Sequence, residues 1–196
     1  MKLSHPYDGL LKLVKDRRTQ VEEFLLCLER RTNWLTCPAS INHHMNVPGG
    51  LVAHSLLTTR TLLDLRDTLS PEYKDETCVI VGMFHDVGKV GSEGQPHYRI
   101  SREQNGLLTY EENKELVTMG LAVRSLYLCA RHIPLTDEEA QAICYHDGQY
   151  VPDNRAVKNR EQPLTLLLHF ADLWSSHVTE PCESTRNVHS LLEKMK

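Results

Sequence analysis

The chain has 196 residues, of which 40% are hydrophobic and 24% charged, and its formal net charge is -4 at pH 7. This length and hydrophobic content suffice for one sizeable core, so we expect one domain. The acidic balance provides no overall basic field that would draw the protein to nucleic acid or to an anionic membrane.

The cysteines and the apolar runs indicate the cellular compartment that we expect. Six cysteines are present without any CxxC pair, and no charged-then-apolar leader opens the chain. We therefore expect reduced thiols and a cytoplasmic protein. No apolar run approaches the roughly 18 residues that would span a bilayer, so we expect no membrane partner.

Hydrophobic residues recur at helical spacing through most of the chain. Residues 7–30 and 49–69 carry them every three or four positions with charges between, which predicts amphipathic helices. Residues 71–86 begin with a proline and acids, as a helix N-terminus prefers, and then become fully apolar, which predicts a central helix. Further helices are expected over residues 110–132, 136–146, 163–177 and 185–196, and Thr136 with Glu139 fits a capping box.

Three stretches rich in Gly, Pro, Asn and Ser are expected as loops, over residues 36–50, 90–107 and 147–163. Strand alternation is almost absent, and we find no repeat or linker that would divide the chain. The sequence therefore predicts an all-α, single-domain helical bundle with long loops.

Ionisable residues interrupt four of the apolar helices, namely His54, His85, Asp86, His146, His169 and Asp172. Buried ionisable groups are costly unless they are paired or bind metal, so one shared metal site would explain them together. Imidazole and carboxylate suit Mn²⁺, Fe²⁺, Co²⁺, Ni²⁺ or Zn²⁺, with Mg²⁺ as a further candidate. Adjacent His85 and Asp86 point about 100° apart on a helix, so both reach one ion only near the helix end, which we expect at Gly88.

The order of these residues resembles the histidine–aspartate (HD) superfamily of metal-dependent phosphohydrolases. The matching motifs are His54, then "HDVGK" with His85 and Asp86, then Asp172 in "HFADLW". Residues 34 to 178 look like the bacterial and phage HD-family hydrolases and, more distantly, the HD domain of bacterial 3′-to-5′ exoribonucleases. The resemblance implies one HD domain over residues 1–196, with N-terminal helices at 1–33, the HD core at 34–178 and a C-terminal helix at 179–196.

The resemblance also implies the roles of individual residues. Lys89 of "HDVGK" would face the substrate phosphate, which suits an ammonium group, although a solvated lysine is the alternative reading. The metal ligands carried over from the family are His54, His85, Asp86 and Asp172, with Asp86 and Lys89 also counted as catalytic.

The number of metal ions depends on two further positions. His146 corresponds to a histidine that helps bind a second ion in two-metal members of the family. Those members also have a histidine where this chain has Leu121, and leucine cannot bind a metal. We therefore expect one divalent ion and assign His146 as a general acid or base, or as a phosphate contact. His132 lies about three helical turns past Leu121, so we do not expect it to replace the missing ligand.

Loop residues are candidates for substrate binding. His43 and His44 precede the His54 helix, where they either touch the substrate or pack the loop. Residues 92–106 form a loop of a length often found in lids and binding loops. In that loop Arg99 and Arg102 are candidates to clamp phosphate, and Tyr98 is a candidate to stack on a base.

Three more residues are candidates for a role at the site, each with a simpler structural alternative. Arg124 and Tyr150 are weaker candidates for substrate contact, with solvated surface as the alternative for each. His169 shares a helix face with Asp172, and we expect it to be a hydrogen-bonded neighbour of the site or a core residue rather than a ligand.

Three functions fit these features. The leading one is hydrolysis of a phosphoester or phosphoanhydride in a small phosphorylated substrate, by preference a nucleotide, through attack of metal-activated water. The alternatives are a 3′-to-5′ nuclease on single-stranded nucleic acid, and a nucleotide-binding regulatory module with weak catalysis. A nuclease needs a basic groove with aromatic platforms, of which the sequence offers little, and an intact "HDVGK" argues against the module. The oligomeric state is left open.

Overall fold

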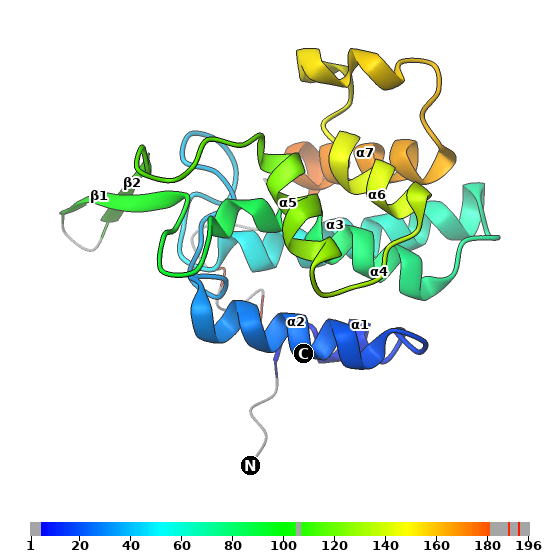
Figure 1. Ribbon diagram of the computed structural model, residues 1–196, viewed down its shortest axis with the longest axis horizontal. Helices are drawn as coiled ribbons and strands as arrows, with labels where there is room; N and C mark the ends of the chain where they lie inside the picture. The colour runs from blue at the N-terminus through cyan, green and yellow to red at the C-terminus, as the bar shows by residue number, and fades with distance from the viewer. Residues whose placement is uncertain (1–4, 105–106, 181–187, 189–191, 193–196) are drawn as a thin grey trace.

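Helices dominate the computed structural model, which describes residues 5–104, 107–180, Val188 and Leu192 (Figure 1). The helices are α1 (Asp8–Leu11), α2 (Arg18–Arg31), α3 (Gly50–Leu69), α4 (Asp75–Phe84), α5 (Leu121–Ala130), α6 (Asp137–Tyr145) and α7 (Pro163–Trp174). Short 3₁₀ turns are η1 (Val87–Val90), η2 (Gly148–Tyr150) and η3 (Pro152–Val157), and α7 continues into a π-helical turn, η4 (Ser175–Thr179). Two strands, β1 (Tyr98–Gln104) and β2 (Leu107–Glu112), form an antiparallel hairpin.

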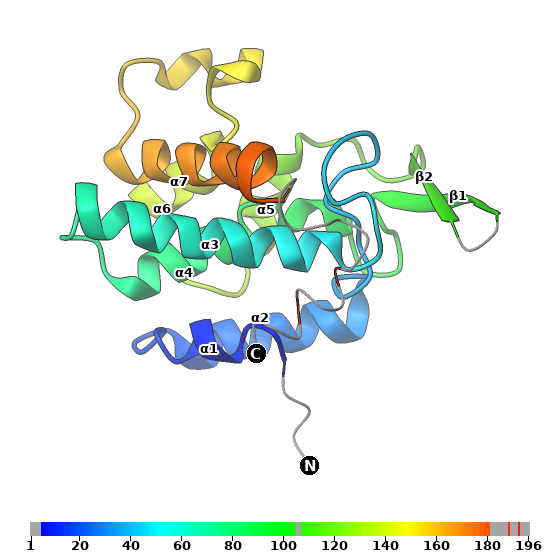
Figure 2. The same cartoon turned by 180° about the vertical axis from the view of Figure 1, so that it is seen from behind.

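The long helix α3 is the centre of the bundle. It packs against α4 on one side and α7 on the other, while α6 contacts both α5 and α7. Helices α1 and α2 form a separate layer beneath α3 and α4, and the hairpin projects from one end (Figures 1 and 2). The prediction of an all-α bundle is therefore confirmed.

The predicted amphipathic pattern accounts for the packing of the N-terminal layer. Val21, Phe24, Leu25 and Leu28 of α2 are buried. The ring of Phe24 lies 5.0 Å from that of Phe84 at the end of α4, which joins this layer to the central helices. Burial of such side chains stabilises the fold by about 1.5–3 kcal/mol each.

A buried ion-pair network ties α2 to α4 and α6. The Arg17 guanidinium, just before α2, donates to Glu76 of α4 at 2.8 Å and to Glu139 of α6 at 2.6 and 2.7 Å. Glu76 also accepts the backbone N–H groups of residues 15–17. The predicted capping box of α6 is confirmed, because Thr136 and Glu139 exchange side-chain to backbone hydrogen bonds.

Gly82 sets how closely α4 approaches α3. A Cβ atom at this position would lie 2.7 Å from Oγ1 and 2.8 Å from Cα of Thr59 on α3. Only glycine therefore allows this crossing. Since His85 follows Gly82 by one turn and His54 precedes Thr59 on α3, the close crossing places these two imidazoles beside each other.

Two sequence expectations about secondary structure were wrong. Residues 98–104 and 107–112 form paired strands rather than a loop running into a helix, and the helix expected over 110–132 begins only at Leu121. The physical reason is cross-strand pairing: Tyr98 to Gln104 align with Leu107 to Glu112, with an irregularity between Ile100 and Arg102 that disturbs the period-two pattern.

Gly88 does not end a helix as expected. Helix α4 already ends at Phe84, and Gly88 lies inside η1. A Cβ at Gly88 would meet the carbonyl oxygen of Leu121 at 2.3 Å, and its N–H donates to Ser125 Oγ at 2.8 Å. The glycine therefore serves close packing of η1 on α5.

Two further expectations concern the domain division of the chain and membrane-spanning helices. The C-terminal helix expected over 179–196 falls almost entirely outside the described residues, and the division of the chain into one HD domain stays a prediction. Among the described residues, each helix is too short or too polar to cross a lipid bilayer.

Candidate metal centre and adjoining pocket

Five side chains from four helix regions converge beside the N-terminal part of α3. His54 Nε2 lies 3.2 Å from His85 Nε2 and 3.1 Å from Asp172 Oδ1. Asp86 Oδ2 lies 3.5 Å from His54 Nε2 and 3.6 Å from His85 Nε2. His146 Nε2, at the end of α6, lies 3.7 Å from Asp86 Oδ1. The structure thus brings together all four predicted metal ligands and the predicted catalytic histidine.

The three imidazoles are held with their Nε2 atoms facing one another. Each Nδ1 donates to an oxygen acceptor: His54 to Glu180 Oε1 at 2.5 Å, His85 to the Gly82 carbonyl at 2.8 Å, and His146 to the Ile143 carbonyl at 2.9 Å. Because carbonyl and carboxylate oxygens only accept, each Nδ1 carries a proton, so the neutral form of each imidazole offers its Nε2 as a ligand. Metal-binding histidines are oriented by the same kind of hydrogen bond.

Glu180 is the site residue that the sequence did not indicate. Its side chain is fully buried, and its second carboxylate oxygen lies 2.6 Å from His44 Nδ1. Glu180 therefore holds two imidazoles at once, His54 in the cluster and His44 at the edge of it. It reaches this position through η4, the π-helical turn that follows α7, and such turns occur frequently at functional sites.

The charges in the cluster stabilise one another. Burial alone would lower the pKa of His54, but hydrogen bonds with Asp172 and Glu180 raise it to about 10. Burial alone would likewise lower the pKa of His146, yet Asp86 and the charge of Asp147 raise it to about 9. The cluster therefore favours a positive charge between its carboxylates.

The pKa values of the other cluster residues are lowered. Burial lowers the pKa of His85 to about 4, so this imidazole is neutral at pH 7, as a metal ligand must be. Burial alone would raise the pKa values of Asp86 and Asp172. The positive charge of Lys89 instead holds the pKa of Asp86 below its usual range, and the hydrogen bond with His54 does the same for Asp172.

Lys89 is buried next to this cluster. Its ammonium group donates to Asp86 Oδ2, and although burial alone would lower its pKa, the Asp86 charge raises the pKa above its usual range. Tyr98 of β1 is also buried near Lys89: burial raises the pKa of its phenol to about 12, and the Lys89 charge opposes that rise. Lys89 is thus a fixed cation beside the proposed ligands rather than a solvated side chain.

A pocket of about 690 Å³ opens beside the cluster. Its lining residues are His43, His44, Asp147, Tyr150, His169, Asp172, Leu173, Ser176 and His177. Asp172 belongs to both the cluster and the pocket, so a ligand in the pocket has direct access to the cluster. His169 donates through Nδ1 to the His146 carbonyl at 2.7 Å, which makes it the hydrogen-bonded neighbour that the sequence suggested.

The predicted substrate-binding residues lie in different parts of the fold. His43 and His44 line the pocket beside the cluster. Arg102 lies exposed on the hairpin, whereas Arg99 is half-buried and pairs with Glu115 at 2.8 Å. Arg124 is buried and lines a different pocket, together with His97 and residues 112–121. The roles of these three arginines in substrate binding stay predictions.

Leu121 and His132 are the two positions considered for binding a second ion. Leu121 is the first residue of α5, which packs on η1. His132 stacks on Phe24 with ring centroids 4.8 Å apart, on the side of the bundle covered by α2.

The donor set fits a divalent metal ion. Two overlapping groups, His54 with His85 and Asp86, and His85 with His146 and Asp172, each have ligand atoms within 4.8 Å of one another. The Nε2 atoms of His54 and His85 face each other at 3.2 Å, so either a proton or a metal cation between them offsets the repulsion of their lone pairs. Neutral imidazole with carboxylate is the ligand set of Mn²⁺, Fe²⁺, Co²⁺, Ni²⁺ and Zn²⁺ sites.

Comparison with known proteins gives one curated relative. The chain is 28% identical over 148 residues to a dihydroneopterin 2′,3′-cyclic phosphate phosphodiesterase from Methanocaldococcus jannaschii. The match covers 73% of this chain and 53% of the relative, so the chain spans about half the length of that protein. No protein-family model matches the chain, and no solved structure matches it.

Proposed function

We propose that this protein is a metal-dependent phosphohydrolase of the HD type. On this proposal it cleaves a phosphoester bond in a small phosphorylated substrate, by preference a nucleotide or a related cyclic phosphate. The observation that carries the proposal is the convergence of three oriented Nε2 atoms with two carboxylates around one point. The similarity to a cyclic phosphate phosphodiesterase supports the same chemistry.

His54, His85, Asp86 and Asp172 would hold the ion. When bound there, a divalent ion lowers the pKa of water and neutralises charge on a phosphoryl group. Glu180 keeps the proton of His54 on Nδ1, which leaves Nε2 free for the ion. Burial of His54 and His85 excludes water from that side and strengthens the electrostatic interactions of the site.

Lys89 and His146 supply the remaining chemistry. The Lys89 ammonium stabilises negative charge that develops on the phosphoryl oxygens, since it is fixed beside Asp86 and protonated at pH 7. His146 Nε2 lies 3.7 Å from both Asp86 Oδ1 and Asp147 Oδ1, at the boundary between cluster and pocket. We assign it to proton transfer with the leaving group or to a hydrogen bond with the phosphate.

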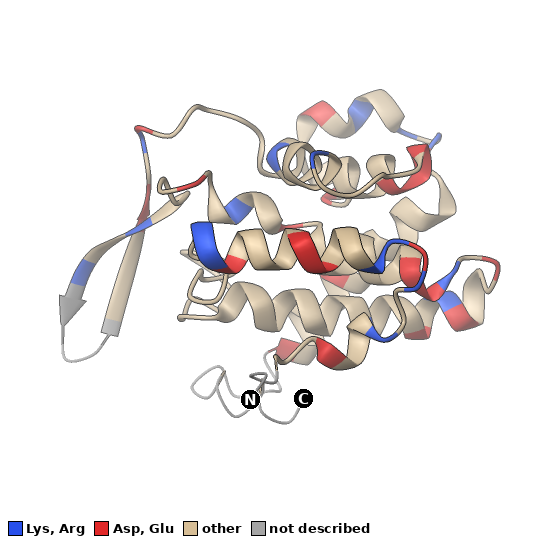
Figure 3. Ribbon diagram, turned by 60° about the horizontal axis from the view of Figure 1, so that its bottom comes forward, with Lys and Arg blue, Asp and Glu red and all other residues tan. Residues whose placement is uncertain are grey.

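The charge distribution favours a small substrate over a nucleic acid strand. Helices α2 and α3 each carry both arginines and acidic residues, so charges of both signs are mixed along them (Figure 3). A nuclease needs a continuous positive groove that follows the phosphate backbone. The pocket beside the cluster instead contains two acidic residues, Asp147 and Asp172.

The test is product release from a panel of substrates by the full chain. The panel holds nucleoside monophosphates and triphosphates, 2′,3′-cyclic nucleotides and short oligonucleotides, each with Mn²⁺, Co²⁺, Ni²⁺, Fe²⁺, Zn²⁺ or Mg²⁺. Turnover of one small-molecule class that disappears in Asp86→Ala would support the proposal. Shortening of oligonucleotides alone would favour a nuclease, and no turnover despite bound metal would favour a regulatory module.

A further inference from the structure

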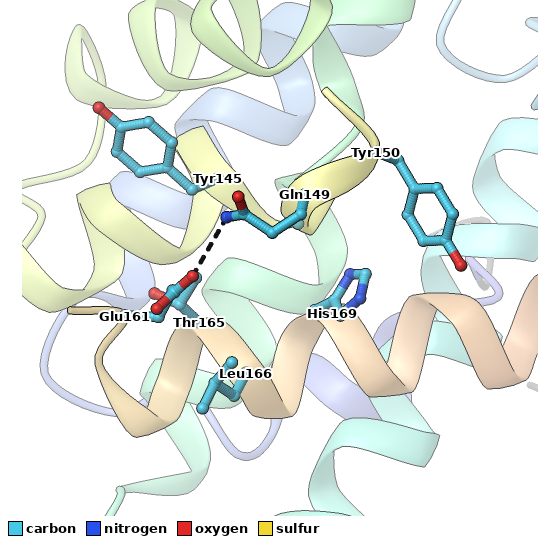
Figure 4. Close-up of a pocket in the computed structure, with 8 residues that line it drawn as sticks. Tyr145, Gln149, Tyr150, Glu161, Thr165, Leu166 and His169 are labelled. Atoms are coloured by element: carbon cyan, nitrogen blue, oxygen red, sulfur yellow. Dashed lines mark hydrogen bonds between the residues drawn. The ribbon is translucent and has the colours of Figure 1, made fainter. Parts of the chain in front are cut away.

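A second pocket adjoins the first along α7. It measures about 290 Å³ and lies between η2 and the first turns of α7, with Tyr145, Gly148, Gln149, Tyr150, Glu161, Thr165, Leu166 and His169 as its lining (Figure 4). Tyr150 and His169 line both pockets. The two pockets therefore adjoin each other, and we call this second one the outer pocket.

Helix α7 connects the outer pocket with the metal cluster. Thr165, His169 and Asp172 follow one another at spacings of four and three residues, so they share one helix face. At a rise of about 1.5 Å per residue, His169 lies ~4.5 Å and Thr165 ~10 Å along the helix from Asp172. A phosphate at the cluster and a ring in the outer pocket are thus separated by the length of a sugar or of a short carbon chain.

The outer pocket presents an aromatic surface for such a ring. Tyr150 is 77% exposed, an unusual state for a large aromatic side chain that lines a pocket. Its ring centroid lies 6.1 Å from that of His169, and Figure 4 shows the two rings on the same side of the pocket. His169 is fixed by its bond to the His146 carbonyl and by Gly148, where a Cβ would lie 2.7 Å from the imidazole.

The opposite side of the outer pocket carries hydrogen-bonding groups. The Glu161 carboxylate accepts from Gln149 Nε2 at 3.2 Å (Figure 4). Its other oxygen accepts from the Arg160 backbone N–H at 3.0 Å. Each carboxylate oxygen has a further lone pair, so Glu161 retains two acceptor positions. Gln149 fixes the carboxylate in place and has its own amide oxygen as a further acceptor.

We propose that the outer pocket binds the heterocycle of the substrate and selects a 2-amino-4-oxopyrimidine edge, as found in guanine and in pterins. This inference rests on the proposed function of the adjoining cluster. That edge presents a ring N–H and an amino group side by side, and a carboxylate accepts both at once. Adenine and cytosine place a ring acceptor where guanine has the N–H, so the Glu161 carboxylate discriminates against them. Tyr150 stacks on the ring, which contributes to affinity for any base.

The first test is binding without turnover, with the full chain in the absence of added metal. Isothermal titration with guanosine 5′-monophosphate and adenosine 5′-monophosphate should give a guanine preference of about 10- to 100-fold, the range expected for hydrogen bonds to a charged group. Glu161→Gln should reduce that ratio toward one, while Glu23→Gln on the exposed face of α2 should leave it unchanged. Equal affinities for the two nucleotides in the wild type would overturn the proposal.

The second test measures the contribution of the Tyr150 ring to binding and shows whether the bound heterocycle is guanine or a pterin. Tyr150→Ala should weaken guanosine 5′-monophosphate binding by about 10-fold or more, and Tyr150→Phe should retain it, because stacking needs the ring alone. Comparison of guanosine 2′,3′-cyclic phosphate with dihydroneopterin 2′,3′-cyclic phosphate then shows whether guanine or a pterin is preferred. Binding that Tyr150→Ala leaves intact would contradict this location of the ring.

Turnover distinguishes this inference from the proposed function. Bis(4-nitrophenyl) phosphate has no such heterocycle, so its metal-dependent hydrolysis tests the cluster alone. Hydrolysis of this ester without guanine preference in binding would refute the outer pocket and leave the proposed function standing. Guanine preference without hydrolysis of any phosphoester would support the outer pocket and refute the proposed function.

Discussion

The Oε1 atom of Glu180 lies 2.5 Å from Nδ1 of His54, although 126 residues separate the two along the chain. Both side chains are fully buried, and the other Glu180 oxygen binds His44. This carboxylate–imidazole pair decides which nitrogen of His54 faces the cluster. It also ties the segment after α7 to the N-terminal part of α3.

Replacement of Glu180 should therefore weaken metal binding without removing a ligand. Glu180→Gln changes the charge at fixed size, and we expect a 10- to 100-fold loss of affinity for Mn²⁺ or Zn²⁺, the usual effect of losing such an orienting partner. Metal titration with a competing chelator measures it. Glu161→Gln is the matched control, because Glu161 lies outside the cluster; equal loss in both variants would contradict an orienting role for Glu180.

Removal of a carboxylate ligand should abolish metal binding. Wild-type protein in metal at 100 times Kd should gain about 2.7 kcal/mol in free energy of unfolding, because the ion binds only the folded chain. Asp86→Ala and Asp172→Ala should show almost none of this gain. Asp64→Ala, at an exposed position of α3, should keep it in full. Full stoichiometric binding in either ligand variant would show that the cluster has been assigned wrongly.

A second ion should be restored by one substitution. Leu121 begins α5 directly against η1, the turn that carries Lys89. On the proposed HD assignment, Leu121→His supplies the imidazole expected at this position in two-metal members, so metal content should rise from the one ion we propose toward two. Elemental analysis after dialysis measures the ratio, with Leu121→Asn as a control of similar size. A ratio that stays at one would mean that the position does not face the cluster.

Stability should depend on Glu76 in a pH-dependent way. Burial alone would raise the pKa of Glu76, but the hydrogen bonds from Arg17 and the backbone of residues 15–17 lower it. Glu76→Gln should therefore reduce the free energy of unfolding at pH 7 by about 1–3 kcal/mol, as for a buried hydrogen-bonded charge.

The sign of the pH effect follows from that lowered pKa. A carboxyl group whose pKa is lower in the folded state stabilises fully above its unfolded value of about 4.3 and loses this contribution as pH falls through the folded value. The difference between Glu76→Gln and wild type in urea denaturation should thus be constant from pH 7 to 5 and shrink below pH 4. Exposed Glu72→Gln is the control. A difference that grows on acidification would contradict the assignment.

Sequence periodicity was sufficient for most of the helices and for the polar residues that interrupt them. His54 and Asp172 interrupt apolar helix faces, and His85 with Asp86 ends one, so each is visible as a local exception to an otherwise apolar pattern. The bundle then brings them together because α3 packs against both α4 and α7.

The parts that were missed depend on contacts between distant segments. Glu180 stands in the stretch "HVTEPCE", which has no apolar periodicity, and it reaches His54 only through the π-helical turn η4. The hairpin was missed because the irregularity between Ile100 and Arg102 breaks the alternation that identifies a strand. Arg99 was a candidate phosphate ligand from its position after the motif, yet the strand places it next to Glu115.

The most direct test of the central claim is to locate the metal. Crystals of the full chain grown with Mn²⁺ should show an anomalous-difference peak bonded to His54 Nε2, His85 Nε2, Asp86 and Asp172, at distances of roughly 2.0–2.3 Å. His146 should be the nearest further imidazole. A peak elsewhere, or its absence from this position when Mn²⁺ is bound in solution, would contradict the account.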